Sequence, residues 1–103
     1  MTQSINIQSI TVIGRRWFDR INGNTYFSAV GLVDGKEVVS IPFEYGYDNH
    51  FEDRIFQELE KGGYLPGVIH HNNGSSERLW NYCDRNKIAK HTIVTDVKRK
   101  KDL

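Results

Sequence analysis

The sequence is poor in the residues and segments that define several large classes of protein. It has one cysteine, Cys83, in 103 residues, so no disulfide can form within the chain, and we expect a reducing compartment. No apolar run approaches the ~18 residues of a membrane-spanning helix, and the start lacks the apolar stretch of a secretory signal. The formal net charge is +1, which demands neither nucleic acid nor membrane as a partner. We therefore expect a cytoplasmic protein that does not bind membranes.

Patterns of catalytic and metal-binding residues are also missing. The four histidines lack the spacing of zinc ligands, and no glycine-rich phosphate loop or nucleophile elbow occurs. Cys83 falls beside Trp80 on the apolar side of an expected short helix, which indicates a buried structural thiol. Glu52 and Asp53 are expected on a solvated helix face, where carboxyl groups have no catalytic environment. We predict no enzyme activity, no metal and no cofactor.

The first half of the chain reads as three antiparallel strands. Asn22-Gly23 and Asp34-Gly35 are strong turn signals between runs of β-branched and aromatic residues, and Gly14 indicates a break in the first run. A tight second turn pairs Val33 with Lys36, Val30 with Val39 and Tyr26 with Phe43. Alternation then predicts one core face made of Tyr26, Val30, Leu32, Val39, Ile41 and Phe43.

The second half changes to helical spacing. Apolar residues recur every three or four positions at Phe51, Ile55, Phe56 and Leu59, which predicts a helix that ends at Gly62-Gly63. A second helix over about 77–86 is expected to bury Leu79, Trp80 and Cys83, and residues 91–97 alternate as a last strand. The prediction is one α+β domain over 1–103, in the order β-β-β-α-α-β. Two helices cover a small antiparallel sheet, and a short basic tail, 98–103, trails out.

The strongest candidate for a binding site is a segment of arginines and aromatic residues. Its candidate binding residues are Arg15, Arg16, Trp17, Phe18 and Arg20. On a strand, Arg16, Phe18 and Arg20 share one face, where they can stack a base and neutralise phosphates or clamp an anionic nucleotide. The alternative is that Trp17 and Phe18 fill the core while Asp19 pairs with an arginine.

A loop and the chain end supply the remaining candidates. Tyr45 and Tyr47 flank a glycine before the first helix, where they either anchor a partner or cover the edge of the core. The tail residues Lys98, Arg99, Lys100 and Lys101 either bind nucleic acid in a salt-sensitive manner or are simply solvated. Acids gather over 44–61 and bases over 85–101, so opposite charges favour a homo-oligomer.

Several short strings spread over most of the chain form a recognisable set. They are Arg15-Arg16-Trp17-Phe18, Asn22-Gly23-Asn24-Thr25-Tyr26, Val33-Asp34-Gly35, Tyr45-Gly46-Tyr47, Leu79-Trp80-Asn81-Tyr82-Cys83 and Val97-Lys98-Arg99-Lys100-Lys101-Asp102-Leu103. Together they resemble a group of small proteins encoded by bacteriophages and prophages. The resemblance implies a phage product made in the bacterial cytoplasm, and small phage proteins often bind and disable host factors, including defence systems. It assigns no catalytic or binding residue.

Two functional hypotheses follow. The first is a non-enzymatic phage protein that binds and sequesters or inhibits a host component, either a protein or a nucleotide ligand. The alternative is a nucleic-acid-binding accessory protein that uses the arginine and aromatic strand together with the basic tail.

Overall fold

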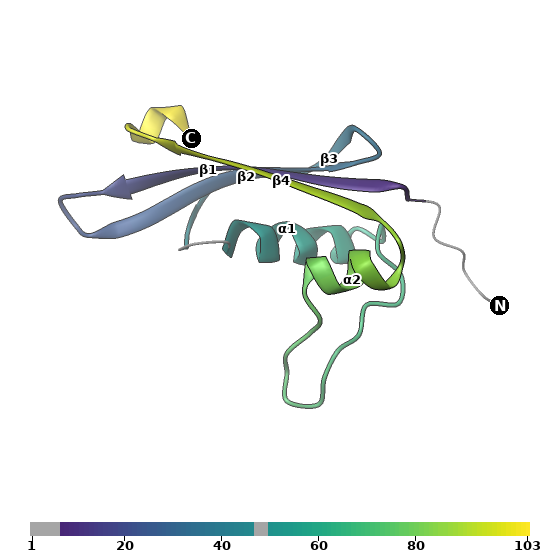
Figure 1. Cartoon of the computed structure of the whole chain (residues 1–103). Helices are drawn as coiled ribbons and strands as arrows, with labels where there is room; N and C mark the ends of the chain where they lie inside the picture. The colour runs from purple at the N-terminus through teal and green to yellow at the C-terminus, as the bar shows by residue number, and fades with distance from the viewer. Residues whose placement is uncertain (1–6, 47–49) are drawn as a thin grey trace.

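The structure, a computed structural model, describes residues 7–46 and 50–103 (Figure 1). Its elements, in chain order, are β1 (Ser9–Asp19), β2 (Asn24–Val33), β3 (Lys36–Tyr45), α1 (His50–Lys61), α2 (Leu79–Arg85), β4 (Ala89–Val97) and the 3-10 turn η1 (Lys100–Asp102). The α+β class and the order β-β-β-α-α-β predicted from the sequence are confirmed. No helix in the described part of the chain is long and apolar enough to cross a membrane.

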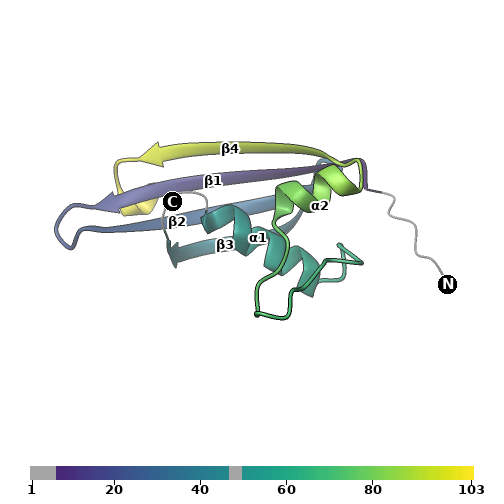
Figure 2. The same ribbon diagram turned by 60° about the horizontal axis from the view of Figure 1, so that its bottom comes forward.

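The four strands form one sheet in the order β3-β2-β1-β4. The pairs β1–β2 and β2–β3 are antiparallel, whereas β4 lies beside β1 and runs parallel to it. The sheet is therefore mixed and not antiparallel throughout, because the chain crosses one face of the sheet through α1 and α2 before it returns as β4. Figure 2 shows both helices on that face, with β3 and β4 at the two edges.

The core lies between the helices and this one face of the sheet. The predicted apolar side of α1 is confirmed, since its four apolar residues are all buried. The sheet contributes buried side chains from three strands, and α2 adds buried side chains of its own: Ile10 and Val12 of β1, Phe27 and Ala29 of β2, Ile41 of β3, and Leu79, Tyr82 and Cys83 of α2. Trp80 was expected among them, but its side chain is 54% exposed. A helix this short presents only one narrow apolar side, which excludes Trp80.

β2 turns the opposite face to the core from the one predicted. Phe27 and Ala29 are buried, whereas Tyr26, Val30 and Leu32 are half-buried on the face away from the helices. Apolar and polar residues alternate regularly along both strands, so the sequence pattern gives no sign of this change. The cause lies in how β2 pairs with β3. One inserted residue is enough to exchange the faces of a strand relative to its neighbour.

The pairing shifts twice along β3. Val33 pairs with Lys36 across the predicted tight turn, but between Gly31 and Leu32 the register moves by one residue. As a result Val39 lies opposite Gly31, and Ile41 lies opposite Ala29, on the helix side. After the second shift Tyr26 pairs with Tyr45, so the expected pairing of Tyr26 with Phe43 was wrong, and Phe43 is 41% exposed.

Polar contacts fix α1 to both edge strands. Glu52, predicted to be solvated, is buried and accepts hydrogen bonds from Lys90 Nζ at 2.7 Å and Thr92 Oγ1 at 3.0 Å, both on β4. On the other side, Arg54 donates two hydrogen bonds of 2.9 Å to the carboxylate of Glu44 on β3. These bonds from Arg54 lower the pKa of Glu44. The helix is therefore held by charge pairs at both sides and by apolar contacts in the middle.

The basic tail does not trail out as predicted. The residues after β4 fold back over the face of the sheet opposite the helices, where η1 lies in Figure 1. Arg15 Nη1 donates to the backbone oxygen of Asp102 at 3.4 Å, and Arg99 Nε donates to the Asp102 carboxylate at 3.0 Å. Leu103 is half-buried against this face, so apolar contact and hydrogen bonds together order the segment.

Two glycines let α1 lie close to the sheet. A Cβ atom at Gly31 of β2 would lie 2.7 Å from Cγ2 of Ile55, and one at Gly14 of β1 would lie 2.7 Å from Cδ2 of Phe51. Neither distance allows a methyl group unless the side chain of Phe51 or Ile55, or the helix that carries it, moves. Gly14 was expected to break the first strand, but β1 runs through it without interruption.

We predict that Gly31→Ala lowers the free energy of unfolding by about 1–3 kcal/mol, because the added methyl group overpacks the contact with Ile55. Denaturant titration followed by circular dichroism measures the change. Ser28→Ala, on the opposite face of the same strand, is the matched control and should change stability by less than about 0.5 kcal/mol. Equal stability of the two variants would show that the close approach is not required.

Candidate functional site

The sheet has a step at the end of β4. This strand stops at Val97, which pairs with Trp17, while β1 continues to Asp19. Beyond Val97, β1 pairs with β2 alone among the strands of the described residues. In Figure 1 the β1–β2 hairpin projects past the end of α1, so neither β4 nor a helix covers its tip.

A groove of about 590 Å³ lies at this step, and we name it the hairpin groove. Its walls come from two segments that are far apart in the sequence: Trp17, Phe18, Asp19, Arg20 and Ile21 from the hairpin, and Val97 and Lys98 at the end of β4. Two aromatic, two aliphatic and two basic residues therefore border one open space at the edge of β1, with Trp17 and Phe18 on opposite faces of the strand. Its volume falls within the range of about 300–1,000 Å³ that is usual for sites of small organic ligands.

Asp19 orders the tip of the hairpin. Its carboxylate accepts hydrogen bonds from the Asn22 side chain at 2.7 Å and from the backbone N–H groups of Ile21 at 3.0 Å and Asn22 at 3.3 Å. The hydrogen bond from the Asn22 side chain is the main reason that the pKa of Asp19 is lowered. The expectation that Asp19 pairs with an arginine was wrong, because the donors that hold its carboxylate belong to the turn.

Trp17 is fixed by a row of stacked rings, which we name the aromatic ladder. The ring of Trp17 stacks on that of Tyr26 with centroids 5.8 Å apart, and Tyr26 stacks on Phe43 at 4.9 Å. Tyr45 meets Tyr26 edge-on at 5.7 Å. The ladder crosses β1, β2 and β3 on the face away from the helices. Trp17 is half-buried, outside the core, and its orientation is set by the ladder.

The other apolar side chains of the hairpin groove are exposed. Phe18 is 54% exposed. Alternation along β1 puts it on the helix side, next to the hairpin tip, which projects past the end of α1 in Figure 1. Ile21, at the tip of the hairpin, is 93% exposed. The alternative that Phe18 fills the core was wrong. Two large apolar side chains exposed to solvent beside a groove are typical of a binding surface.

The predicted basic residues of β1 fall into different places. Arg20 lines the hairpin groove together with Lys98, which directly follows β4. Arg16 donates its Nε–H to the carboxylate of Asp96 at 3.0 Å and so connects β1 with β4. Arg15 lies on the opposite face, where its guanidinium reaches the backbone of Asp102. Of the expected stripe of Arg16, Phe18 and Arg20, only Phe18 and Arg20 line the groove, since Arg16 is bonded to Asp96 on β4.

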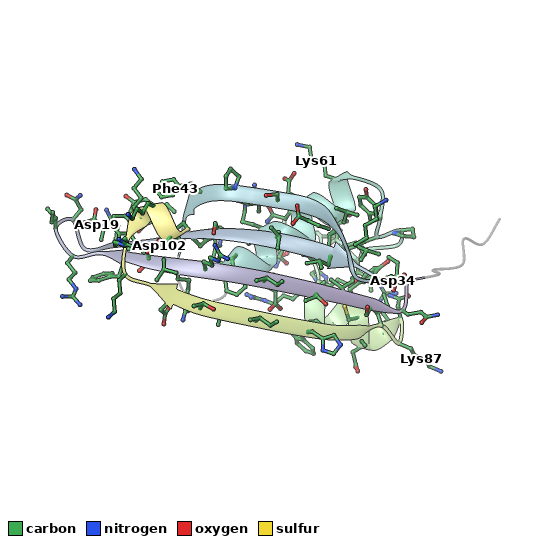
Figure 3. All side chains as sticks on the ribbon, turned by 90° about the horizontal axis from the view of Figure 1, so that it is seen from above. Asp19, Asp34, Phe43, Lys61, Lys87 and Asp102 are labelled. Atoms are coloured by element: carbon green, nitrogen blue, oxygen red, sulfur yellow. The ribbon has the colours of Figure 1, made fainter. Side chains whose placement is uncertain are left out.

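The tail residues are divided in a similar way. Arg99 forms its ion pair within the terminal turn, and the ammonium of Lys100 lies 5.0 Å from the centre of the Phe43 ring, a cation–π distance. Figure 3 shows Phe43 and Asp102 close together near the end of the sheet that carries Asp19. Lys101 is exposed. Tyr45 belongs to the aromatic ladder, whereas Tyr47 lies outside the described residues.

Groups suited to covalent or metal chemistry do not gather in the described part of the chain. Within it, no cluster of three or more His, Cys, Asp or Glu side chains could hold a metal ion. Cys83 is buried, and burial raises the pKa of its thiol to about 11. The thiol is therefore protonated at neutral pH and is a poor nucleophile. What the hairpin groove offers is stacking, apolar contact and positive charge.

Sequence reasoning found four groove residues and missed others. It named Trp17, Phe18, Arg20 and Lys98, but it did not place the hairpin beside the end of β4. It assigned Tyr26 and Phe43 of the aromatic ladder to the core, because the register shifts in β3 leave no mark in the alternation. Ile21 carried one available signal, a large apolar residue directly before a turn.

Comparisons of the chain with protein-family models, curated proteins and solved structures found no match in any of the three.

We predict that acid loosens the hairpin tip through Asp19. Because its pKa is lowered in the folded protein, the bonds to Ile21 and Asn22 are complete above the ordinary aspartate value of 3.8 and are lost as pH falls through the lowered pKa. The amide proton shifts of these two residues, followed by NMR, should report a midpoint below the ordinary value. Asp19→Asn should remove this transition, and a midpoint above the ordinary value would contradict the assignment.

Proposed function

We propose that this protein is a non-enzymatic binding protein that captures a nucleotide of its bacterial host in the hairpin groove and thereby sequesters it. The observation that carries the proposal is that the fixed aromatic residue Trp17 and the basic residues Arg20 and Lys98 line one open space. A nucleotide offers a matching pair of groups, a flat base that stacks on an aromatic ring and a phosphate that accepts charged hydrogen bonds.

The fixed position of Trp17 favours this kind of ligand. Stacking of a base on an aromatic side chain contributes about 1–3 kcal/mol, and less is lost to ordering when the ring is already held in place. The aromatic ladder holds Trp17 from behind, and the hydrogen bonds of Asp19 hold the backbone that carries Arg20. Capture requires only binding, and the side chains of the groove supply stacking, apolar contact and positive charge, which are sufficient for binding.

The resemblance of the sequence to small phage proteins supports the same proposal. A phage benefits when one of its products removes a signal of the host, and a protein of this kind acts by stoichiometric capture. Such a role needs a tight, pre-formed site and no turnover.

A single strand of nucleic acid is the second candidate ligand. It is favoured by the openness of the hairpin groove at the exposed tip, which leaves room for a chain to continue past Ile21. The exposed Lys101 in the terminal turn would add a further phosphate contact. Binding of this kind weakens steeply with salt, because each phosphate contact releases about one counterion.

We predict that the protein purified from bacteria in mild salt carries a nucleotide, seen by native mass spectrometry as added mass on an integer multiple of 12.0 kDa. Arg20→Ala with Lys98→Ala should lose this mass, because both cations of the hairpin groove are gone. Lys36→Ala with Lys61→Ala removes the same charge from exposed positions outside the groove, and should retain it. A clean multiple of the chain mass in the unaltered protein would overturn the proposal and favour a host protein as the partner.

Fluorescence separates the two candidate ligands. In a Trp80→Phe background, Trp17 is the one tryptophan left, and a base stacked on it should quench its emission. We expect ATP, used as a model nucleotide, to quench with a weaker salt dependence than an oligonucleotide, because it makes fewer phosphate contacts. Quenching by a thymidine oligonucleotide alone, with a steep salt dependence, would favour the second candidate.

A further inference from the structure

The outer side of β4 is a second surface, and it is separate from the hairpin groove. β4 is an edge strand, and no other strand of residues 7–46 and 50–103 pairs with its outer side. Seven of its nine residues are exposed, including Ile93 at 53% and Val94 at 41%. The strand contains no proline and is rich in β-branched residues. A long edge of this kind readily accepts another strand.

The hydrogen bonds to β1 show which groups of β4 remain available. The N–H of Ala89 donates to the backbone oxygen of Gln8 at 3.0 Å, so Ala89 faces β1. Because backbone groups alternate along a strand, His91, Ile93 and Thr95 also face β1. The residues between them present their N–H and C=O groups to the outside: Lys90, Thr92, Val94 and Asp96.

We infer that two copies of this chain pair antiparallel through β4, about a twofold axis at Ile93. In that register every outward residue meets an outward residue, with Lys90 opposite Asp96 of the second copy and Thr92 opposite Val94. Ile93 meets its own copy at the axis. A shift by two residues in either direction leaves one outward residue without a partner and separates Lys90 from Asp96.

Charge complementarity selects this register. Lys90 Nζ lies 2.7 Å from the carboxylate of Glu52, and Asp96 lies 3.0 Å from Arg16 Nε, so each pair is already formed within one copy. The Asp96 side chain is nevertheless 75% exposed and open to a second cation. Pairing places it beside Lys90 of the second copy, which gives the alternating row Glu52, Lys90, Asp96 and Arg16. The row occurs twice, and it lies on the helix side of the sheet.

The result is one continuous eight-stranded sheet with β3 at both of its edges. The inference goes beyond the proposed function and does not rest on it, because β4 contributes only its last residue, Val97, to the hairpin groove.

Disulfide trapping tests the axis. Residues opposite each other in a non-hydrogen-bonded antiparallel pair have Cα atoms about 4.5 Å apart, within the disulfide range of about 4.4–6.8 Å. Ile93→Cys should therefore form a covalent dimer under mild oxidation. Thr95→Cys lies on the same exposed face, but its two copies would be separated by about 14 Å along the strands. It should stay largely unlinked, and the native Cys83 is buried and should not interfere.

A proline substitution tests whether the outer edge of β4 accepts a second strand. Val94→Pro removes an N–H that faces outward, so pairing with β1 persists while addition of a second strand is blocked. Native mass spectrometry should find the unaltered protein as a dimer and Val94→Pro as a folded monomer, with Val94→Thr still dimeric. Arg20→Ala with Lys98→Ala should also stay dimeric, which separates this result from the fate of the proposed function. A monomeric unaltered protein, or linkage of Thr95→Cys as fast as Ile93→Cys, would overturn the inference.

Discussion

The close contact between α1 and the middle of the sheet is the constraint on which the rest of the structure depends. It exists because Gly14 and Gly31 leave space for Phe51 and Ile55. With the helix at this depth, Glu52 reaches Lys90 on one edge strand and Arg54 reaches Glu44 on the other edge strand. The helix thus spans the sheet and fixes both edges, and the core is complete on one face.

Because the core occupies one face of the sheet, the other face is available for different contacts. The aromatic ladder and the terminal turn occupy it, and they hold Trp17 at the border of the hairpin groove. The groove itself arises because the elements differ in extent. β1 continues beyond the end of β4, and the hairpin projects past the helices (Figure 1). The candidate site is therefore a consequence of where the strands and helices end, and its basic residues Arg20 and Lys98 are far apart in the sequence.

The sequence predicts most of the fold but only part of the site. Local signals were sufficient for α1, whose apolar spacing is regular, and for the turn at Asp34-Gly35, where both φ angles are positive. Long-range pairing was not predictable, because one extra residue near Val38 exchanges the faces of β2 and β3 without altering either pattern. The burial of Glu52 is of the same kind, since it depends on Lys90 and Thr92, which are distant in the sequence.

β4 connects the two proposals through its direction. Its end at Val97 forms the step that opens the hairpin groove, and its outer side carries the self-complementary register. In an antiparallel pair the two copies of Val97 lie at opposite ends of the joined strands, so the two grooves face away from each other. No residue of one groove then reaches the other. Each copy would bind its ligand independently, and pairing would contribute stability to the edge of the sheet without changing the affinity of the site.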